Sequence, residues 1–121
     1  MSAREEERRA RIGRNEAIFR SVNEKIEGVN LAFGEVSERM QLVCECGDAQ
    51  CADPVELTVA AYEALRSDPA MFAVLPGHEL LEAEQVVERH EGYVVVRKLR
   101  GVPEQIARET DPRGAGRSNA S

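Results

Sequence analysis

The feature that most constrains this 121-residue chain is the position of its cysteines, because all three fall within residues 44–51. Zinc prefers thiolate and imidazole ligands arranged as a tetrahedron. Two cysteines at i and i+2 can face one ion when the chain turns beside them, and Gly47 tolerates the positive φ that such a turn often needs. The spacing therefore predicts that Cys44, Cys46 and Cys51 are three of the four ligands of a zinc site.

The fourth ligand is predicted to be His78, one of the two histidines in the chain. It lies in the turn of residues 76–79, where Pro76 restricts φ and the imidazole is presented at low entropic cost. His90 precedes Glu91-Gly92 at the tip of a predicted hairpin, and such tips usually point to solvent. His78 is therefore favoured over His90.

The choice of His78 also depends on the direction of two strands. If the strand that enters Cys44 lies parallel to residues 72–75, Cys44 and His78 both follow the ends of their strands and meet at one edge of a sheet. An antiparallel pairing would place them at opposite ends. The alternatives for the fourth ligand are His90, Asp48, Asp53 and a water molecule.

The cysteines have three other interpretations. A disulfide would leave an odd thiol, and the sequence shows no charged-then-apolar leader that would indicate an oxidising compartment. A cysteine nucleophile would need a base, for which only the two histidines are available. Buried, inert thiols rarely cluster beside Gly, Asp and Gln. The thiols are thus expected to stay reduced in the cytoplasm.

Charge and composition bound the function further. The net charge is −6, and residues 15–110 carry 18 acidic against 9 basic side chains. This acidic body argues against a nucleic-acid partner, and no apolar run approaches the length of a membrane span. Aromatic residues make up only 4% of the chain. The core must therefore be aliphatic and small, which favours a bound metal as an additional source of folding free energy.

The N-terminal third of the chain is expected to hold one long helix. Residues 1–14 mix Arg and Glu and predict a flexible charged arm. In residues 15–40, with Asn15 as N-cap, apolar side chains step by four, four, three, four, three and four along one helical stripe. The members of this stripe are Ile18, Val22, Ile26, Val29, Phe33, Val36 and Met40. The stripe is expected to pack on the sheet of the domain. Because the spacing also suits a coiled coil, a protein partner or self-association through this helix is the alternative.

The remaining elements are short. Strands are predicted at residues 41–43, 55–57, 72–75, 86–90 and 93–99, with Glu91-Gly92 as a hairpin turn. Helices are predicted at residues 59–66 after Thr58 and at 104–109 after Pro103. The fold class is therefore α+β: a long N-terminal helix packed on a small, mostly antiparallel sheet with a Cys-rich metal loop. Residues 15–110 form the domain, and residues 111–121 are expected to be a disordered tail.

Several segments resemble a group of small bacterial proteins that usually carry only a hypothetical-protein label. The segments are Asn15-Glu16-Ala17-Ile18-Phe19-Arg20, Cys44-Glu45-Cys46 with Cys51, Pro76-Gly77-His78-Glu79, and Val86-Val87-Glu88 followed by Tyr93-Val94-Val95-Val96. The resemblance extends over roughly residues 15–113. It implies one self-contained module and brings no activity, because none is assigned to the group.

These observations predict a small zinc-binding interaction or regulatory module without catalysis. One alternative is a thiol redox switch that releases zinc on oxidation. Another is a metal-dependent hydrolase with an open zinc position and Glu79 as the base. Four protein ligands would disfavour the hydrolase, since no coordination position would remain for water.

Overall fold

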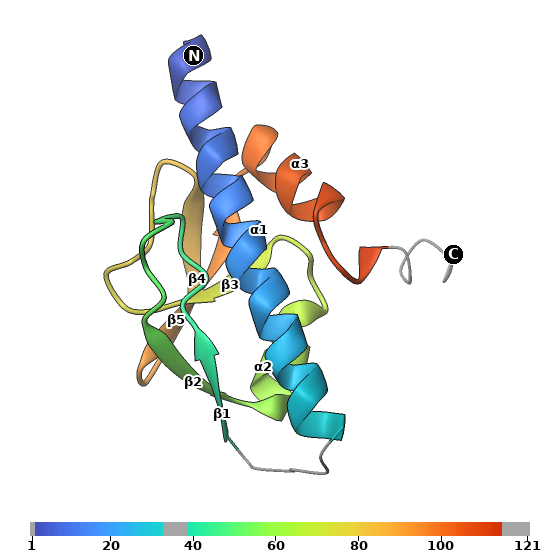
Figure 1. Cartoon of the computed structure of the whole chain (residues 1–121). Coiled ribbons are helices and arrows are strands. Elements are labelled where there is room, and N and C mark those ends of the chain that lie inside the picture. Colours follow the sequence, from blue (N-terminus) through green and yellow to red (C-terminus); the bar gives the residue numbers. More distant parts are fainter. Residues whose placement is uncertain (1, 33–38, 115–121) are drawn as a thin grey trace.

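The computed structural model describes residues 2–32 and 39–114. Helix α1 (Ala3–Ala32) runs the length of the molecule, with the strands on one side of it (Figure 1). Helix α3 (Val102–Glu109) lies beside the N-terminal half of α1, and α2 (Val59–Arg66) lies near its C-terminal half. The architecture is α+β, as the sequence predicts.

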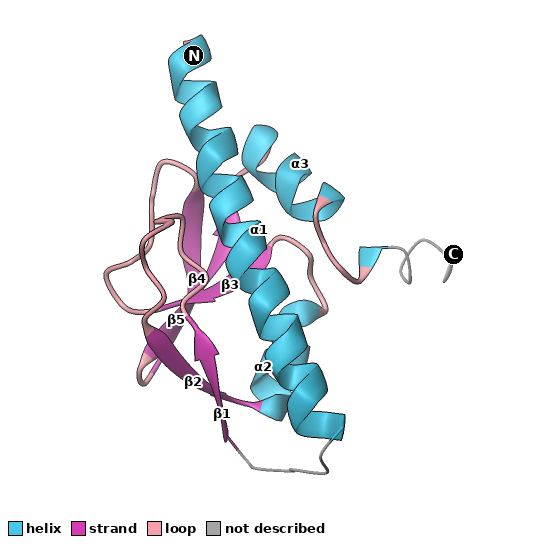
Figure 2. Cartoon of the chain, viewed as in Figure 1, coloured by secondary structure: helices cyan, strands magenta, loops and turns pink. Residues whose placement is uncertain are grey.

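The strands form two small antiparallel sheets (Figure 2). Strand β1 (Arg39–Val43) pairs with β2 (Pro54–Thr58), and the two are joined by the cysteine-bearing segment. The second sheet has the order β3 (Met71–Val74), β5 (Tyr93–Lys98), β4 (Glu84–His90). The expectation of one sheet is therefore corrected to two.

The physical reason for two sheets lies at the outer edge of β3. The amide of Glu45 donates to the carbonyl of Ala73 over 2.9 Å, and the amide of Ala73 donates to the Glu45 carboxylate over 3.0 Å. These bonds occupy backbone groups of β3 that β1 would otherwise use. Strand β1 therefore pairs with β2 alone.

Local signals set the short elements where the sequence predicts them. Thr58 accepts a hydrogen bond from the amide of Ala61 over 3.0 Å and so caps α2. The hairpin between β4 and β5 turns at Glu91-Gly92, where Gly92 has a φ of 89°. Pro103 lies in the first turn of α3, where its missing amide proton costs nothing.

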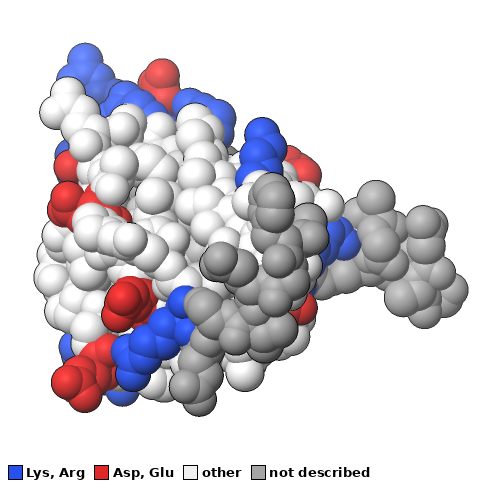
Figure 3. All heavy atoms as spheres, turned by 60° about the horizontal axis from the view of Figure 1, so that its bottom comes forward, with Lys and Arg blue, Asp and Glu red and all other residues white. Residues whose placement is uncertain are grey.

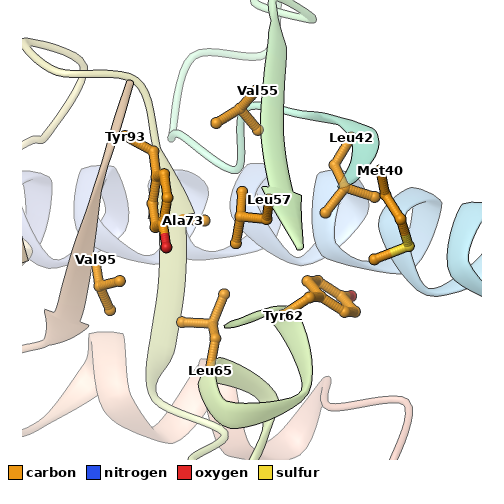
Figure 4. Close-up of a cluster of buried hydrophobic side chains, with 9 residues drawn as sticks. All are labelled: Met40, Leu42, Val55, Leu57, Tyr62, Leu65, Ala73, Tyr93 and Val95. Atoms are coloured by element: carbon orange, nitrogen blue, oxygen red, sulfur yellow. The ribbon is translucent and has the colours of Figure 1, made fainter. Parts of the chain in front are cut away.

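The main apolar core lies between the two sheets and α2 (Figure 4). Its buried members are Met40, Leu42, Val55, Leu57, Tyr62, Leu65, Ala73, Tyr93 and Val95. A second apolar cluster surrounds the cysteines with Phe72, Val74, Val94, Val96 and Ala107. The cysteines therefore belong to a hydrophobic layer of the molecule rather than to its surface.

The expected orientation of α1 is wrong. Ile18, Val22 and Val29 of the predicted stripe are 61%, 39% and 54% exposed, while Ile26 is partly buried. Met40 belongs to β1, and residues 33 and 36 lie outside the described part of the chain. The buried face of α1 is instead mostly polar. Its members are Ile12, Glu16, Arg20, Asn23 and Glu27.

Partners from distant parts of the chain explain this inversion. Glu16 receives a hydrogen bond from Lys98, and Arg20 donates to the carbonyls of Pro69 and Ala107 over 2.7 and 2.8 Å. A buried polar group is tolerated when it is hydrogen-bonded. The polar face can therefore be buried, and the apolar stripe is left facing outward.

Both ends of the predicted domain also need correction. Helix α1 begins at Ala3 rather than Asn15, because Arg9 donates to the carbonyl of Glu82 and Ile12 is buried. Residues 3–14 are thus part of the helix and not a separate arm. At the other end, Asp111 is buried against Arg66 and Arg113 donates to Glu24, so these residues are anchored. Residues 115–121 lie outside the described part of the chain.

Charged side chains of both signs lie mainly around the rim of the face shown in Figure 3. Within residues 2–32 and 39–114, no helix is both long and apolar enough to cross a membrane.

Candidate metal centre

The segment of residues 44–51, here called the cysteine loop, connects β1 to β2. The amide of Cys44 donates to the carbonyl of Asp53 over 2.8 Å and closes the base of the loop. At the far end, Asp48 accepts from the amides of Gln50 and Cys51 over 2.9 and 3.0 Å. This turn returns Cys51 to the neighbourhood of Cys44.

His78 reaches the cysteine loop through β3. The amide of Leu75, just after β3, donates to Cys44 Sγ over 3.2 Å. Gly77 then turns the chain with a φ of 88°, and the amide of His78 donates to the carbonyl of Leu75 over 3.0 Å. The predicted reason for this meeting is wrong, because β1 pairs with β2 and not in parallel with β3.

The fold brings the four predicted side chains into one group. The ligand atoms of Cys44, Cys46, Cys51 and His78 all lie within 4.8 Å of one another. His78 Nδ1 lies 3.7 Å from Cys44 Sγ and 3.6 Å from Cys51 Sγ. The Nδ1 edge of the imidazole therefore faces the sulfurs, and the group has the size and composition of a site that could hold a metal ion.

Backbone amides stabilise the anionic form of each sulfur. Leu75 donates to Cys44 over 3.2 Å, and the backbones of Asp48 and Asp53 act to lower the pKa of Cys46 and of Cys51. An N–H donor stabilises a thiolate more than a thiol, because the acceptor then carries the charge. The backbone is thus arranged for three anionic sulfurs.

Without a cation, however, the three sulfurs cannot all be anionic. A hydrogen bond from Cys44 lowers the pKa of Cys46 to about 5, and the same bond together with burial raises the pKa of Cys44 far above its ordinary value. Burial raises the pKa of Cys51 as well. One thiolate is therefore favoured, with protons on its neighbours. A cation at the centre of the group would replace these protons.

Access to the group is from one side. Cys44 and Cys46 are fully buried, whereas His78 is half-buried. A shallow depression of about 260 Å³ opens beside Cys46 and His78 and is bordered by Asp48, Gly77 and Leu80. This depression is a route by which an ion could enter.

The alternative ligands lie elsewhere. His90 Nε2 is 2.8 Å from Glu88 Oε1, and its ring stacks on Tyr93 at 4.6 Å. The side chain of Asp48 accepts from the backbone of its own loop, and Asp53 is exposed. Neither aspartate belongs to the group of four among the described residues. Glu79, the candidate base, accepts from the amide of Gly77 over 2.7 Å.

Gly47 is needed for space and not for a positive φ. A Cβ at this position would lie 2.5 Å from Ile12 Cγ2 and 2.8 Å from Leu80 Cδ1. The φ of Gly47 is not positive, in contrast to that of Gly77. The glycine therefore allows the cysteine loop to touch α1 directly.

Three residues that contact the cysteine loop or lie within it were not predicted from the sequence. Asn15 and Asn23 of α1 hydrogen-bond the cysteine loop, and Glu45 is fully buried between two cysteines. The alternation of side chains along extended chain could have indicated that Glu45 points away from its neighbours. The roles of the two asparagines depend on the packing of α1 and have no local signal.

Comparisons with protein-family models, curated proteins and solved structures found no match for this chain. The resemblance of residues 15–113 to a group of small bacterial proteins therefore remains a prediction. The geometry of the cysteine–histidine group and its surroundings is the basis for the function proposed below.

Proposed function

We propose that the protein is a zinc-binding interaction module without catalytic activity. The observation that carries this proposal is the spacing between sulfur and nitrogen. Zinc lies about 2.3 Å from sulfur and about 2.0–2.1 Å from nitrogen, so an S–N edge of its tetrahedron is about 3.6 Å. The two distances from His78 Nδ1 to the sulfurs of Cys44 and Cys51 are 3.7 and 3.6 Å. A zinc ion would thus fit with little rearrangement.

The donor set favours a structural role. Three thiolates and one imidazole complete a tetrahedron, so no position remains for a reactive water. Glu79, bonded to the amide of Gly77, is engaged in its own turn. The hydrolase alternative is therefore weakly supported. The redox alternative is disfavoured by burial, because oxidants reach exposed thiolates most readily.

The interaction surface that we propose is the outward face of α1. Ile18, Val22, Lys25 and Val29, here called the outer stripe, repeat at four, three and four positions. An open depression of about 320 Å³ lies along it, bordered by Ile26 and Asn30. The three apolar side chains of the stripe, Ile18, Val22 and Val29, can pack against a second helix.

A second copy of the chain is the proposed occupant. In an antiparallel pair centred on Val22, Lys25 would lie opposite Phe19 of the other copy. The two lysines would then be about 9 Å apart along the helix axis, so like charges would not meet. The stripe has four side chains, whereas a stable interface buries roughly 800 Å² and about 20–30 residues per partner. Weak self-association is therefore expected.

Native mass spectrometry of the purified protein tests the metal proposal. We expect one zinc ion per chain, lost on chelation, with three thiols becoming reactive only afterwards. The control is His90→Ala, because His90 is exposed and lies outside the cysteine–histidine group. This variant should retain the metal. A fully folded chain that neither contains zinc nor takes it up in a competition titration would contradict the proposal.

Light scattering over a range of concentrations tests the interaction surface. We expect the average mass to rise with concentration, and Val22→Asp to abolish this rise. The matched control is Val87→Asp on β4, because Val87 is 39% exposed, as Val22 is. A mass that stays monomeric, or that falls equally in both variants, would exclude self-association through the outer stripe.

A further inference from the structure

Two asparagines of α1 bind the cysteine loop and its entry strand. Asn23, which is fully buried, donates to the carbonyl of Val43 and accepts from its amide, both over 2.8 Å. Asn15 donates to the carbonyl of Gly47 over 2.8 Å. An amide that bonds both backbone groups of a residue fixes the position of that residue. The helix therefore holds the loop at its entrance and at its turn.

Glu45 connects the cysteines to this contact from the inside. Its carboxylate accepts from Asn23 Nδ2 over 2.8 Å and from the amide of Ala73 over 3.0 Å. The flanking residues Cys44 and Cys46 direct their sulfurs to the opposite side, toward His78. One short stretch of chain thus has the metal centre on one side and α1 on the other.

The contact at Gly47 is sterically close as well. Ile12 of α1 and Leu80 both lie where a Cβ of residue 47 would be. Any shift of the loop toward α1 would therefore produce a clash, and a shift away would expose Ile12, which is buried. The packing of this part of α1 is sensitive to the conformation of the cysteine loop.

The rest of the buried face of α1 is largely polar. Glu16 is bonded by Lys98, and Arg20 by the carbonyls of Pro69 and Ala107. Hydrogen bonds weaken steeply when their geometry is disturbed, whereas hydrophobic contacts are not directional. The docking of α1 therefore depends on the exact placement of backbone groups such as those of Val43 and Gly47.

We propose that metal occupancy and the docking of α1 are coupled through Glu45, Asn23 and Asn15. This inference rests on the proposed metal site. Four ligands bound to one ion restrict the backbone of residues 44–51, and removal of the ion returns that freedom to the loop. The hydrogen bonds to the two asparagines then lose their fixed partners. The metal thereby regulates α1, the helix that carries the outer stripe.

Linkage makes the coupling reciprocal. If the ion strengthens the docking of α1, the docked helix must strengthen metal binding by the same factor. Outer-shell partners of metal ligands typically change metal affinity by about 10–100-fold when they are removed. Asn23→Ala should therefore weaken zinc binding, although Asn23 lies on the side of the chain opposite the metal centre.

Hydrogen exchange of the full-length protein, with zinc and after chelation, tests the first half of the proposal. We expect amides in residues 12–24 of α1 to exchange at least about fivefold faster without metal, the lower end of typical coupling factors. The hairpin of β4 and β5, which has its own ladder, should change much less. Equal changes in α1 and the hairpin, or no change in either, would overturn the coupling while leaving the metal site in place.

A zinc competition titration tests the second half. We expect Asn23→Ala to lose about 10–100-fold in affinity and Asn30→Ala, two turns further along the same helix and so farther from the cysteine loop, to lose less than about twofold. If Asn23→Ala does not fold, Glu45→Gln serves instead, because it keeps the shape of the side chain. Equal affinities for the Asn23 or Glu45 variant and for Asn30→Ala would overturn the coupling. A parent protein that binds no zinc at all would overturn both proposals together.

Discussion

His78 and His90 occupy different environments, and this difference predicts different effects of their removal. The Nδ1 atom of His78 faces two sulfurs at 3.6 and 3.7 Å, whereas His90 is exposed and paired with Glu88. Loss of an outer-shell partner typically weakens metal binding by about 10–100-fold. His78→Ala should weaken zinc binding by more than this. His90→Ala should leave the affinity unchanged in the same competition titration. A large loss with His90→Ala and a small one with His78→Ala would reverse the assignment of the fourth ligand.

Glu27 predicts a pH dependence of stability at the scale of a single residue. Burial, with the nearby Glu63 carboxylate, raises the pKa of Glu27 to about 7, although Arg113 lies 3.1 Å away and opposes the shift. Between the ordinary value of 4.5 and about 7, the folded state therefore binds more protons than the unfolded state. Stability from this group is fully present below pH 4.5 and is lost as the pH rises through 7.

Glu27→Gln should remove this contribution to the pH dependence. Denaturant titrations from pH 4 to pH 8 would give the free energy of unfolding of both proteins. The difference between parent and variant should change steadily across that interval, with the variant gaining relative stability at high pH. A difference that does not vary with pH would show that Glu27 titrates normally.

Helix α1 is held against β5 by buried charged side chains. Lys98 of β5 donates to Glu16 of α1 and to Glu84 of β4, and all three side chains are buried. Burial, together with a hydrogen bond to Glu84, raises the pKa of Glu16. A buried carboxyl pair without its cation is strongly unfavourable, so Lys98→Met should destabilise the fold by about 3–5 kcal/mol.

Arg97→Met is the matched control for this prediction. Arg97 is the neighbouring residue of β5, and it pairs with Glu104 over 3.1 Å and with Asp68 over 3.4 Å at a partly exposed site. Such surface pairs contribute about 0–1 kcal/mol. Urea unfolding would compare the two variants. Similar losses of unfolding free energy in both variants would mean that the buried contacts of Lys98 with Glu16 and Glu84 stabilise the fold no more than a surface pair does.

For the whole molecule, the main consequence of the proposed site is that stability depends on metal. The core is small and aliphatic, and bound zinc contributes about 10 kcal/mol or more in small zinc domains. Chelation should therefore lower the thermal midpoint, although the main apolar core, which contains no cysteine, keeps the metal-free chain folded at room temperature. Cys51→Ser should lower the midpoint similarly even with zinc present. The control is Ala49→Ser, at an exposed position of the same loop. Equal midpoints for the two variants in zinc would exclude Cys51 as a ligand.

Much of the fold could be predicted because its signals are local. Thr58 caps α2, Glu91-Gly92 turns the hairpin, and Pro103 opens α3, each acting on residues a few positions away. The four side chains of the candidate site were also predictable, because the three thiols cluster in the sequence and only two imidazoles are available in this chain. The reason why these side chains meet could not be predicted, since it depends on the cysteine loop lying along β3.

The orientation of α1 is what the tertiary structure alone decided. By itself, the sequence determined that a helix forms there, and its apolar stripe predicted which face would be buried. The structure buries the other face, because Glu16, Arg20 and Asn23 find partners 20 to 90 residues away. A periodic pattern indicates which helix face can gain free energy by burying apolar surface. It does not indicate which hydrogen bonds will offset the burial of polar groups. Those bonds exist only once distant segments have been brought together.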